Sequence, residues 1–213
     1  PDNPVPSIGG NVTGMYEWVK LPEGMDRAYV PGRARMRSII EDGPLHQREA
    51  PDIVGARPPY PLLAERPDVM VFQSAPLAAD LEVTGPLEVR LWVSSSAVDT
   101  DFTARLLDIY PLSEDYPSGY HLNLTDSIIR TRYRNGFETA EPMEPGQVYQ
   151  VEIALTPIGN LFKAGHQIRL DISSSNFPRF DVNPNTGEPL GRHTHEVVAR
   201  NTVYFDRKRH SHI

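Results

Sequence analysis

Hydrophobic and polar residues alternate with a period of two through much of the chain after residue 67. In "LEVTGPLEVRLWVSSS" (81–96), Leu87, Val89, Leu91 and Val93 fall on one face, and Trp92 falls among polar residues on the other. Alternation of this kind is typical of a β-strand with one buried face. The pattern therefore predicts a strand here that contributes one side to a hydrophobic core.

Six other segments have the same kind of pattern, and turn signals lie between them. They are residues 68–74, 101–111, 126–135, 148–157, 166–175 and 199–206. Short strands at this spacing predict an all-β fold, an antiparallel sandwich or jelly roll. The best helix candidate is short, "PIGNLFKAG" at 157–165.

The first 67 residues have no comparable pattern. Proline is abundant in the whole chain, at 21 of 213 residues, which is roughly twice the average usage. It gathers in "PDNPVPSIGG" (1–10) and "PPYPLLAERP" (58–67), where it removes backbone donors and fixes turns. We expect residues 1–67 to be an irregular segment that wraps over the same domain, whose sandwich occupies 68–213.

The composition narrows the classes of function. A formal net charge of -7 argues against nucleic-acid binding, which needs a basic surface; the basic run "RNTVYFDRKRH" (200–210) is typical of a solvated face. No apolar stretch approaches the 18 residues of a membrane span. The lack of cysteine excludes disulfides and thiolate chemistry and favours the cytoplasm without establishing it. Because the first residue is Pro1, we expect a piece of a longer polypeptide.

Two serine triplets raise the question of a nucleophile. They lie in "VSSSAVDTDFTARLLDIYP" (93–111) and "DISSSNFPRFDVNPNTG" (171–187), beside several aspartates. A nucleophile of the α/β-hydrolase type needs a Gly-x-Ser-x-Gly turn, which this sequence lacks. Serine and aspartate are also favoured where strands end, because their side chains bond nearby backbone amides. We interpret the triplets as corners of a sheet and predict no catalytic residue.

Metal and glycan sites are only partly matched. Asp181, Asn183 and Asn185 alternate as in a calcium loop, but Thr186 replaces the required glycine and Arg192 the bidentate glutamate. His193 and His195 make half of a metal site without a matching pair. Sequons stand at Asn11 and Asn123, and without evidence of secretion they carry little weight. We predict no metal ion and no cofactor.

Several longer motifs, taken in order, resemble one family. They are "PDNPVPSIGG" (1–10), "PDVMVFQSAPLAADLEVTGPLEVRLWVSSSAVDTDFTARLLDIYP" (67–111), "IIRTRYRN" (128–135), "PGQVYQVEI" (145–153) and "FKAGHQIRLDISSSNFPRFDVNPNTG" (162–187). They are similar to the C-terminal non-catalytic domain of cocaine-esterase-like serine hydrolases, which group with Xaa-Pro dipeptidyl-peptidases, α-amino-acid ester hydrolases and cephalosporin acylases. The resemblance covers roughly half of the chain.

The resemblance implies a parent enzyme in three parts: an α/β-hydrolase domain with the catalytic triad, a helical cap, and a galactose-binding-like jelly roll packed against both. This chain resembles the jelly roll alone, so its implied partners are the hydrolase and cap domains of the same polypeptide. The resemblance also implies a further strand after Ile213. Ester, amide and Xaa-Pro peptide substrates all stay open, as does a homo-oligomer.

Two sets of contact residues follow from the resemblance. The loops "SSSAVDTD" (94–101) and "SSSNFPRFD" (173–181) are expected to contact the other domains, or alternatively to pin one end of the sandwich to itself. The candidate contact residues are Asp99, Asp101, Phe102, Asn176, Phe177, Phe180, Asp181 and Trp92. In some relatives the loop after "GG" lines the acyl pocket, which makes Met15, Tyr16 and Trp18 candidate substrate-facing residues.

A second hypothesis is a stand-alone module that binds carbohydrate or another ligand. Jelly rolls of this type often bind sugars with exposed aromatic residues. Trp92, together with Tyr110, Tyr116 and Tyr120, is the candidate platform. The fold alone does not decide between the hypotheses, because one architecture serves many functions.

Overall fold

The computed structural model describes residues 63–213 except 118, 177, 178 and 190, and the backbone of three short strands nearer the N-terminus. These strands are β1 (Gly14–Tyr16), β2 (Met36–Ser38) and β3 (Leu45–Gln47). The chain forms two compact units, Pro1–Leu45 and His46–Ile213. In the first unit β1 and β2 pair antiparallel, and the second unit holds all the features described below.

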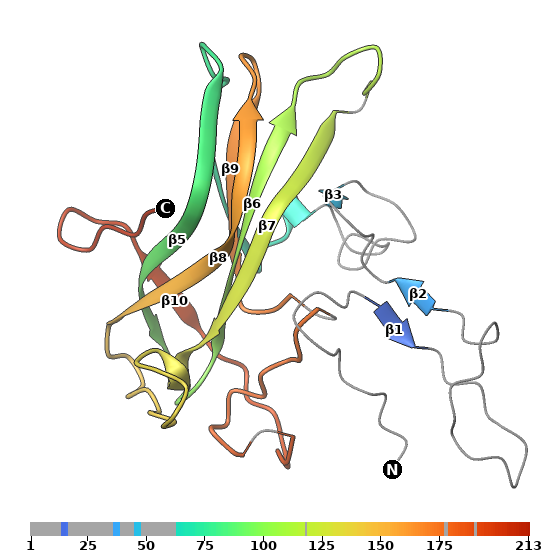
Figure 1. Ribbon diagram of the computed structural model, residues 1–213. Coiled ribbons are helices and arrows are strands. Elements are labelled where there is room, and N and C mark those ends of the chain that lie inside the picture. The colour runs from blue at the N-terminus through green and yellow to red at the C-terminus, as the bar shows by residue number, and fades with distance from the viewer. Residues whose placement is uncertain are drawn as a thin grey trace, which may run out of the picture. The chain divides into compact units, whose positions relative to one another are not determined.

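The second unit is built from two antiparallel sheets (Figure 1). One has the strand order β10-β5-β8 and the other β3-β7-β6-β9-β4. Neither helix in the described ranges is long and apolar enough to cross a membrane. The elements are the 3-10 helix η1 (Leu63–Glu65), β4 (Val69–Gln73), β5 (Leu81–Ser95), β6 (Asp101–Tyr110), β7 (Tyr120–Arg130), the 3-10 helix η2 (Thr131–Tyr133), β8 (Tyr149–Phe162), β9 (Gln167–Ser173) and β10 (Asn201–Tyr204).

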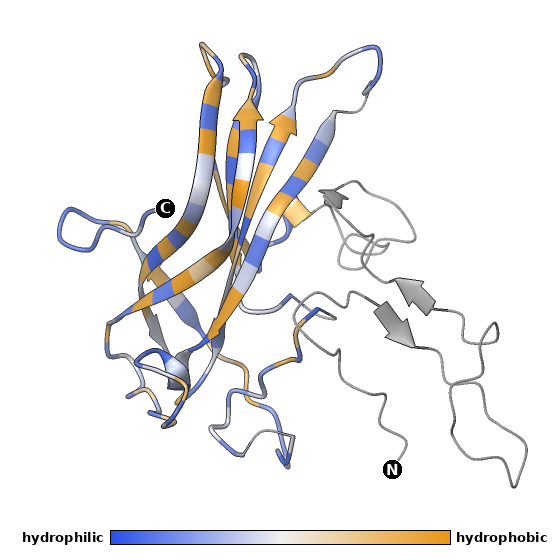
Figure 2. Ribbon diagram, viewed as in Figure 1, coloured by the Kyte–Doolittle hydropathy of each residue, from blue (hydrophilic) through white to orange (hydrophobic). Residues whose placement is uncertain are grey.

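The hydrophobic core lies between the two sheets. The three-stranded sheet contributes alternate residues of β5 and β8 and one residue of β10, and the five-stranded sheet contributes alternate residues of β6 and one residue each of β7 and β9. Figure 2 shows this alternation as orange and blue bands along the strands. The shared core confirms the predicted all-β antiparallel sandwich. Its buried residues are Val89, Leu91, Val93, Phe102, Ala104, Leu106, Ile129, Val151, Ile153, Leu155, Ile172 and Val203.

All seven predicted strands are present, but two local predictions are wrong. Residues 157–162 are not helical, because β8 runs on to Phe162 and pairs with the first residues of β5. The fourth strand begins at Tyr120 rather than at residue 126 and ends at Arg130, where η2 begins. The jelly-roll and galactose-binding-like class of the sandwich stays a prediction, as does a domain boundary at residue 68.

The outer face of the five-stranded sheet carries buried charges instead of a solvated surface. On β9, Arg169 is 1% exposed and donates two hydrogen bonds of 2.7 Å to the carboxylate of Asp171. On β7, Asp126 pairs with Arg179 at 2.6 Å and accepts a hydrogen bond of 2.9 Å from Asn176. Asn176 also accepts a hydrogen bond of 2.7 Å from Arg105 on β6. The segment after β9 is therefore tied to the sheet by charged groups.

Candidate functional site

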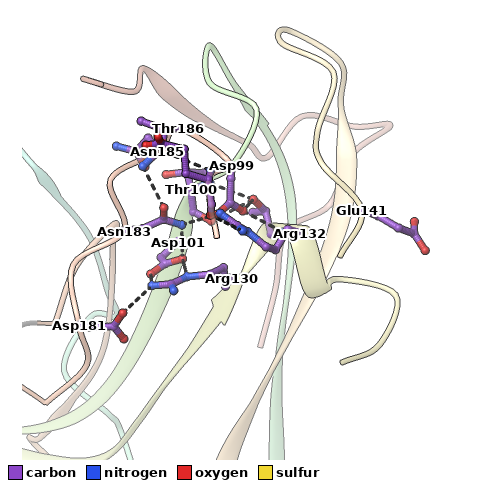
Figure 3. Close-up of polar contacts among 12 residues, drawn as sticks. Asp99, Thr100, Asp101, Arg130, Arg132, Glu141, Asp181, Asn183, Asn185 and Thr186 are labelled. Atoms are coloured by element: carbon purple, nitrogen blue, oxygen red, sulfur yellow. Dashed lines mark hydrogen bonds and ion pairs between the residues drawn. The ribbon is translucent and has the colours of Figure 1, made fainter. Parts of the chain in front are cut away.

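Three connections meet at one end of the sandwich, the lower end in Figure 1. They are the turn from β5 to β6 (96–100), the stretch from β7 to β8 (131–148), and the irregular segment between β9 and β10 (174–200). Both serine triplets lie here. We call this region the loop end; Figure 3 shows the polar contacts that hold it together.

Asp99 is the centre of these contacts. Its side chain is 0% exposed. One carboxylate oxygen accepts hydrogen bonds from the backbone N–H of Arg132 at 3.0 Å and from the hydroxyl of Thr131 at 3.2 Å. The other accepts bonds from the Arg132 guanidinium at 2.8 Å and from the amide of Asn183 at 2.9 Å. A charge buried this deeply is stable only with such partners, so Asp99 holds the start of η2 in place.

Asp101 forms a second buried ion pair beside the first (Figure 3). Both of its carboxylate oxygens accept hydrogen bonds of 2.9 Å from Arg130, and one also accepts a bond of 2.7 Å from Asn183. Burial raises the pKa of Asp101, and the bonds from Arg130 and Asn183 oppose that rise. The bonds with Asp101 in turn raise the pKa of Arg130. The two parallel N–H···O bonds have the geometry of a bidentate guanidinium–carboxylate pair.

Asn183 joins the third connection to the two ion pairs. Its amide nitrogen bonds to both Asp99 and Asp101, and its side-chain oxygen accepts the backbone N–H of Asn185 at 2.9 Å. Arg132 donates to the carbonyl of Glu188 at 2.9 Å. Gly187 lies so close to the β5–β6 turn that an added Cβ would be 2.9 Å from Val98 Cγ2. The segment 183–188 is thus fixed against the turn by hydrogen bonds and by contact.

The serine hydroxyls form hydrogen bonds of the kind expected at the corners of a sheet. Ser95 accepts the backbone N–H of Ala97 at 3.1 Å, and Ser96 accepts that of Arg200 at 2.9 Å. Ser173 bonds to the hydroxyl of Thr103 at 2.6 Å, and Ser174 accepts from Asn201 at 2.7 Å. These contacts join strand ends to neighbouring backbone, in agreement with the interpretation of the triplets as sheet corners.

The predicted contact residues differ in how far they are exposed to solvent. Asp99, Asp101 and Phe102 are buried at 0%, 1% and 1% exposure, so their side chains act inside the domain. The side chain of Asp181 is 81% exposed and 3.5 Å from Arg130. Phe180 is half-buried, with the Arg179 guanidinium 5.6 Å from its ring centre.

Other predicted residues lie elsewhere or outside the described part. Asn176 is half-buried and bound to the outer face of the sheet, as described above. Phe177 and Trp18 lie outside the described residues, and Met15 and Tyr16 are described only as backbone of β1. Their predicted roles stay predictions.

Trp92 and the three tyrosines do not form one platform. Trp92 is half-buried on β5 in the three-stranded sheet, three residues before the strand reaches the loop end. Tyr110, Tyr116 and Tyr120 pack on one another around the β6–β7 connection, with ring centres 4.7 to 5.8 Å apart. That connection is at the opposite end of the sandwich (Figure 1).

The sequence analysis missed the arginines that complete the site. Arg130 and Arg132 are two residues apart, as are Asp99 and Asp101, and Asp101 is paired with Arg130 in the ladder of β6 and β7. Matching i, i+2 charges at the facing ends of two strands are a signal in the sequence, but the signal becomes readable only when the pairing of strands is known.

Metal and glycan chemistry have no support in the described residues. No group of three or more His, Asp or Glu side chains in that part of the chain could hold a metal ion. His195 lies 3.6 Å from Glu188, and hydrogen bonds from Thr194 lower the pKa of that glutamate. Asn123 of the sequon is 5% exposed, so the folded domain does not present it to a glycosylating enzyme.

Comparisons with known proteins agree with one another. A family model described as the X-Pro dipeptidyl-peptidase C-terminal non-catalytic domain matches residues 28–213. The cocaine esterase of Rhodococcus sp. (strain MB1 Bresler) is 40% identical over 151 residues, which are 70% of this chain and 25% of that esterase.

Two solved structures are similar in fold. An aminopeptidase from a marine sediment Thaumarchaeota archaeon has a TM-score of 0.63 and 33% identity, over 66% of this chain and 24% of its own. An α-amino acid ester hydrolase has a TM-score of 0.64 and 32% identity, over 67% of this chain and 24% of its own. This chain thus spans about a quarter of the length of these relatives.

Proposed function

Because the chain belongs to the family of X-Pro dipeptidyl-peptidase C-terminal non-catalytic domains, we propose that it is the accessory domain of a serine hydrolase and uses its loop end to close the acyl pocket. The hydrolase and cap domains would belong to the same parent polypeptide. Catalysis would take place there, through an acyl-enzyme on a serine. This domain would supply one wall of the pocket and no catalytic residue.

The observation that carries the proposal is the pair of buried aspartate–arginine bridges at the loop end. Asp99 with Arg132 and Asp101 with Arg130 fix three irregular connections that have little regular backbone pairing of their own. A rigid surface loses little conformational entropy when it docks, because its loops are already ordered. Buried bridges are a poor source of net stability, so their use here favours a role in shaping a surface.

The loop end also presents side chains that a partner domain could cover. Phe137, in the connection after η2, is 82% exposed, and Val182, beside Asn183, is 52% exposed. Asp181, next to Val182, adds a charge. Interdomain interfaces combine apolar contacts with polar ones in this way.

The test is the parent hydrolase with Phe137→Ala and Asp181→Ala together. Both side chains are exposed, so the melting temperature should stay within about 2 °C of the parent. If they contact the partner, kcat/KM should fall by about fivefold or more, since truncation of a contact anchor commonly costs over about 1 kcal/mol. Leu112→Ala, at 74% exposure beyond β6, is the matched control at the opposite end.

Two esters separate pocket closure from simple support. With a small and a bulky acyl group on the same leaving group, closure predicts that the variant changes their ratio of kcat/KM. Support alone predicts equal losses for both esters. An unchanged kcat/KM for both would contradict the contact itself.

A further inference from the structure

Residues 191–198, which we call the knuckle, are eight consecutive exposed residues between β9 and β10. Their sequence is "GRHTHEVV". Val198 is 90% exposed and Val197 is 42% exposed, side by side. A single exposed apolar residue is ordinary, whereas two adjacent exposed valines form a small apolar patch that a partner surface could cover.

The knuckle is held in its middle and near its C-terminal end. The backbone N–H of Val197 donates to the carbonyl of Pro184 at 2.9 Å, and the amide of Asn185 donates to the carbonyl of Val197 at 2.8 Å. Ser96 and Arg200 exchange hydrogen bonds of 3.1 and 2.9 Å. In the middle of the knuckle, the backbone and hydroxyl of Thr194 donate hydrogen bonds to Glu188. The two valines are therefore presented in a fixed position.

This fixed position depends on the same buried bridges as the rest of the loop end. The backbone N–H of Asn185 bonds to the side chain of Asn183, which in turn bonds to Asp99 and Asp101. The backbone carbonyl of Glu188 accepts a hydrogen bond from Arg132. The knuckle is thus part of one connected structure that includes the two buried ion pairs.

We propose that the knuckle places Val197 and Val198 in an apolar recess of the hydrolase part of the parent polypeptide. This inference rests on the proposed function and names its docking anchor. The chain spans about a quarter of its relatives' length, so most of the parent is available to cover the knuckle. Arg192 within the knuckle and Arg200 just after it make no ion pair within the described ranges, which predicts acidic groups around the recess.

The test is chemical footprinting of the intact parent enzyme with diethyl pyrocarbonate, followed by mass spectrometry. His193 and His195 lie within the knuckle, whereas the exposed His210 and His212 lie near the C-terminus and serve as internal references. If the knuckle is docked, His193 and His195 should be modified at least fivefold more slowly than the references. In Val198→Asp the difference should largely disappear, because a carboxylate is not accepted in an apolar recess.

Two controls keep the result specific. Leu112→Asp makes the same charge change at an exposed leucine beyond β6 and should leave the footprint unchanged. Because Val198 is 90% exposed, Val198→Asp should leave the melting of this domain unchanged, so loss of protection cannot be assigned to unfolding.

Two outcomes would overturn the inference. Equal modification of all four histidines in the wild-type parent would show that nothing covers the knuckle. Protection that disappears on dilution would assign the cover to a second copy of the protein. The proposed function has its own readout in the Phe137 and Asp181 variant, so it can survive the failure of the knuckle or fail while the knuckle stands.

Discussion

At the scale of single residues, the loop end shows which properties of Asp99 and Asp101 the sequence could predict and which it could not. Asp99 and Asp101 were recognisable as landmarks, and the pattern left two roles open, contact with another domain or pinning one end of the sandwich to itself. Both are at most 1% exposed, and their side-chain partners within the chain are Arg130, Thr131, Arg132 and Asn183. Burial depends on strands brought together from distant parts of the sequence, so local residue type could not establish it.

Gly187 is the residue whose replacement tests this packing most directly. It has a positive φ of 74°, and an added Cβ would lie 2.9 Å from Val98 Cγ2. A β-branched side chain cannot easily rotate out of the way. Gly187→Ala should therefore lower the free energy of unfolding by about 2 kcal/mol or more, through backbone strain and the clash together.

Gly191→Ala is the matched control in a chemical denaturation experiment. Its φ of 68° imposes similar strain, but its Cβ would meet open space, so about 1 kcal/mol is expected. Val98→Ala removes the clashing atom. When it is combined with each glycine variant, the two variants should lose similar amounts of free energy of unfolding. Equal losses in the presence of Val98 would contradict the close contact.

At the scale of elements, period-two alternation located the strands but not their ends. The segment 157–165 was the best candidate for a short helix. Residues 157–162 are instead part of a strand, because β5 offers a partner from Leu81 to Gly85, with a shift in register before Leu87. Pairing over this distance in sequence overrides local preference. The central strands were predictable because the alternating apolar residues that form their buried face also give the sequence a strong period of two.

A polar contact joins the two sheets near the far end of the sandwich. Asp108 on β6 is 1% exposed; it lies 2.8 Å from Nδ1 of His166 and accepts a bond of 3.3 Å from Asn160 on β8. Asp108→Ala would leave both partners without this acceptor. The free energy of unfolding should fall by about 2–3 kcal/mol in a urea titration.

The control for that variant is Glu152→Ala, also on β8. Glu152 is exposed and pairs with Arg90 at 3.3 Å, so its loss should cost under about 1 kcal/mol. A loss for Asp108→Ala no larger than that of the control would mean that the contact does not hold the sheets together.

At the scale of the whole molecule, the sequence predicted the sandwich and its family, whereas the extent of the domain stays a prediction. A change of pattern at residue 67 suggested that the sandwich begins at 68. The second compact unit begins at His46, and the five-stranded sheet includes β3 at its edge beside β7. A three-residue strand in a proline-rich stretch has too few residues to show a period, so alternation could not detect it.

Two shortened chains decide where the stable unit begins. A chain of residues 45–213 keeps β3 and η1, and it should melt within about 3 °C of the whole chain. A chain of residues 68–213 loses both elements and makes β7 an open edge. Its melting temperature should fall by roughly 5 °C or more, since about 1 kcal/mol corresponds to 2–4 °C at this size. Equal melting of the two shortened chains would place the boundary at residue 68 and leave β3 with no part in stability.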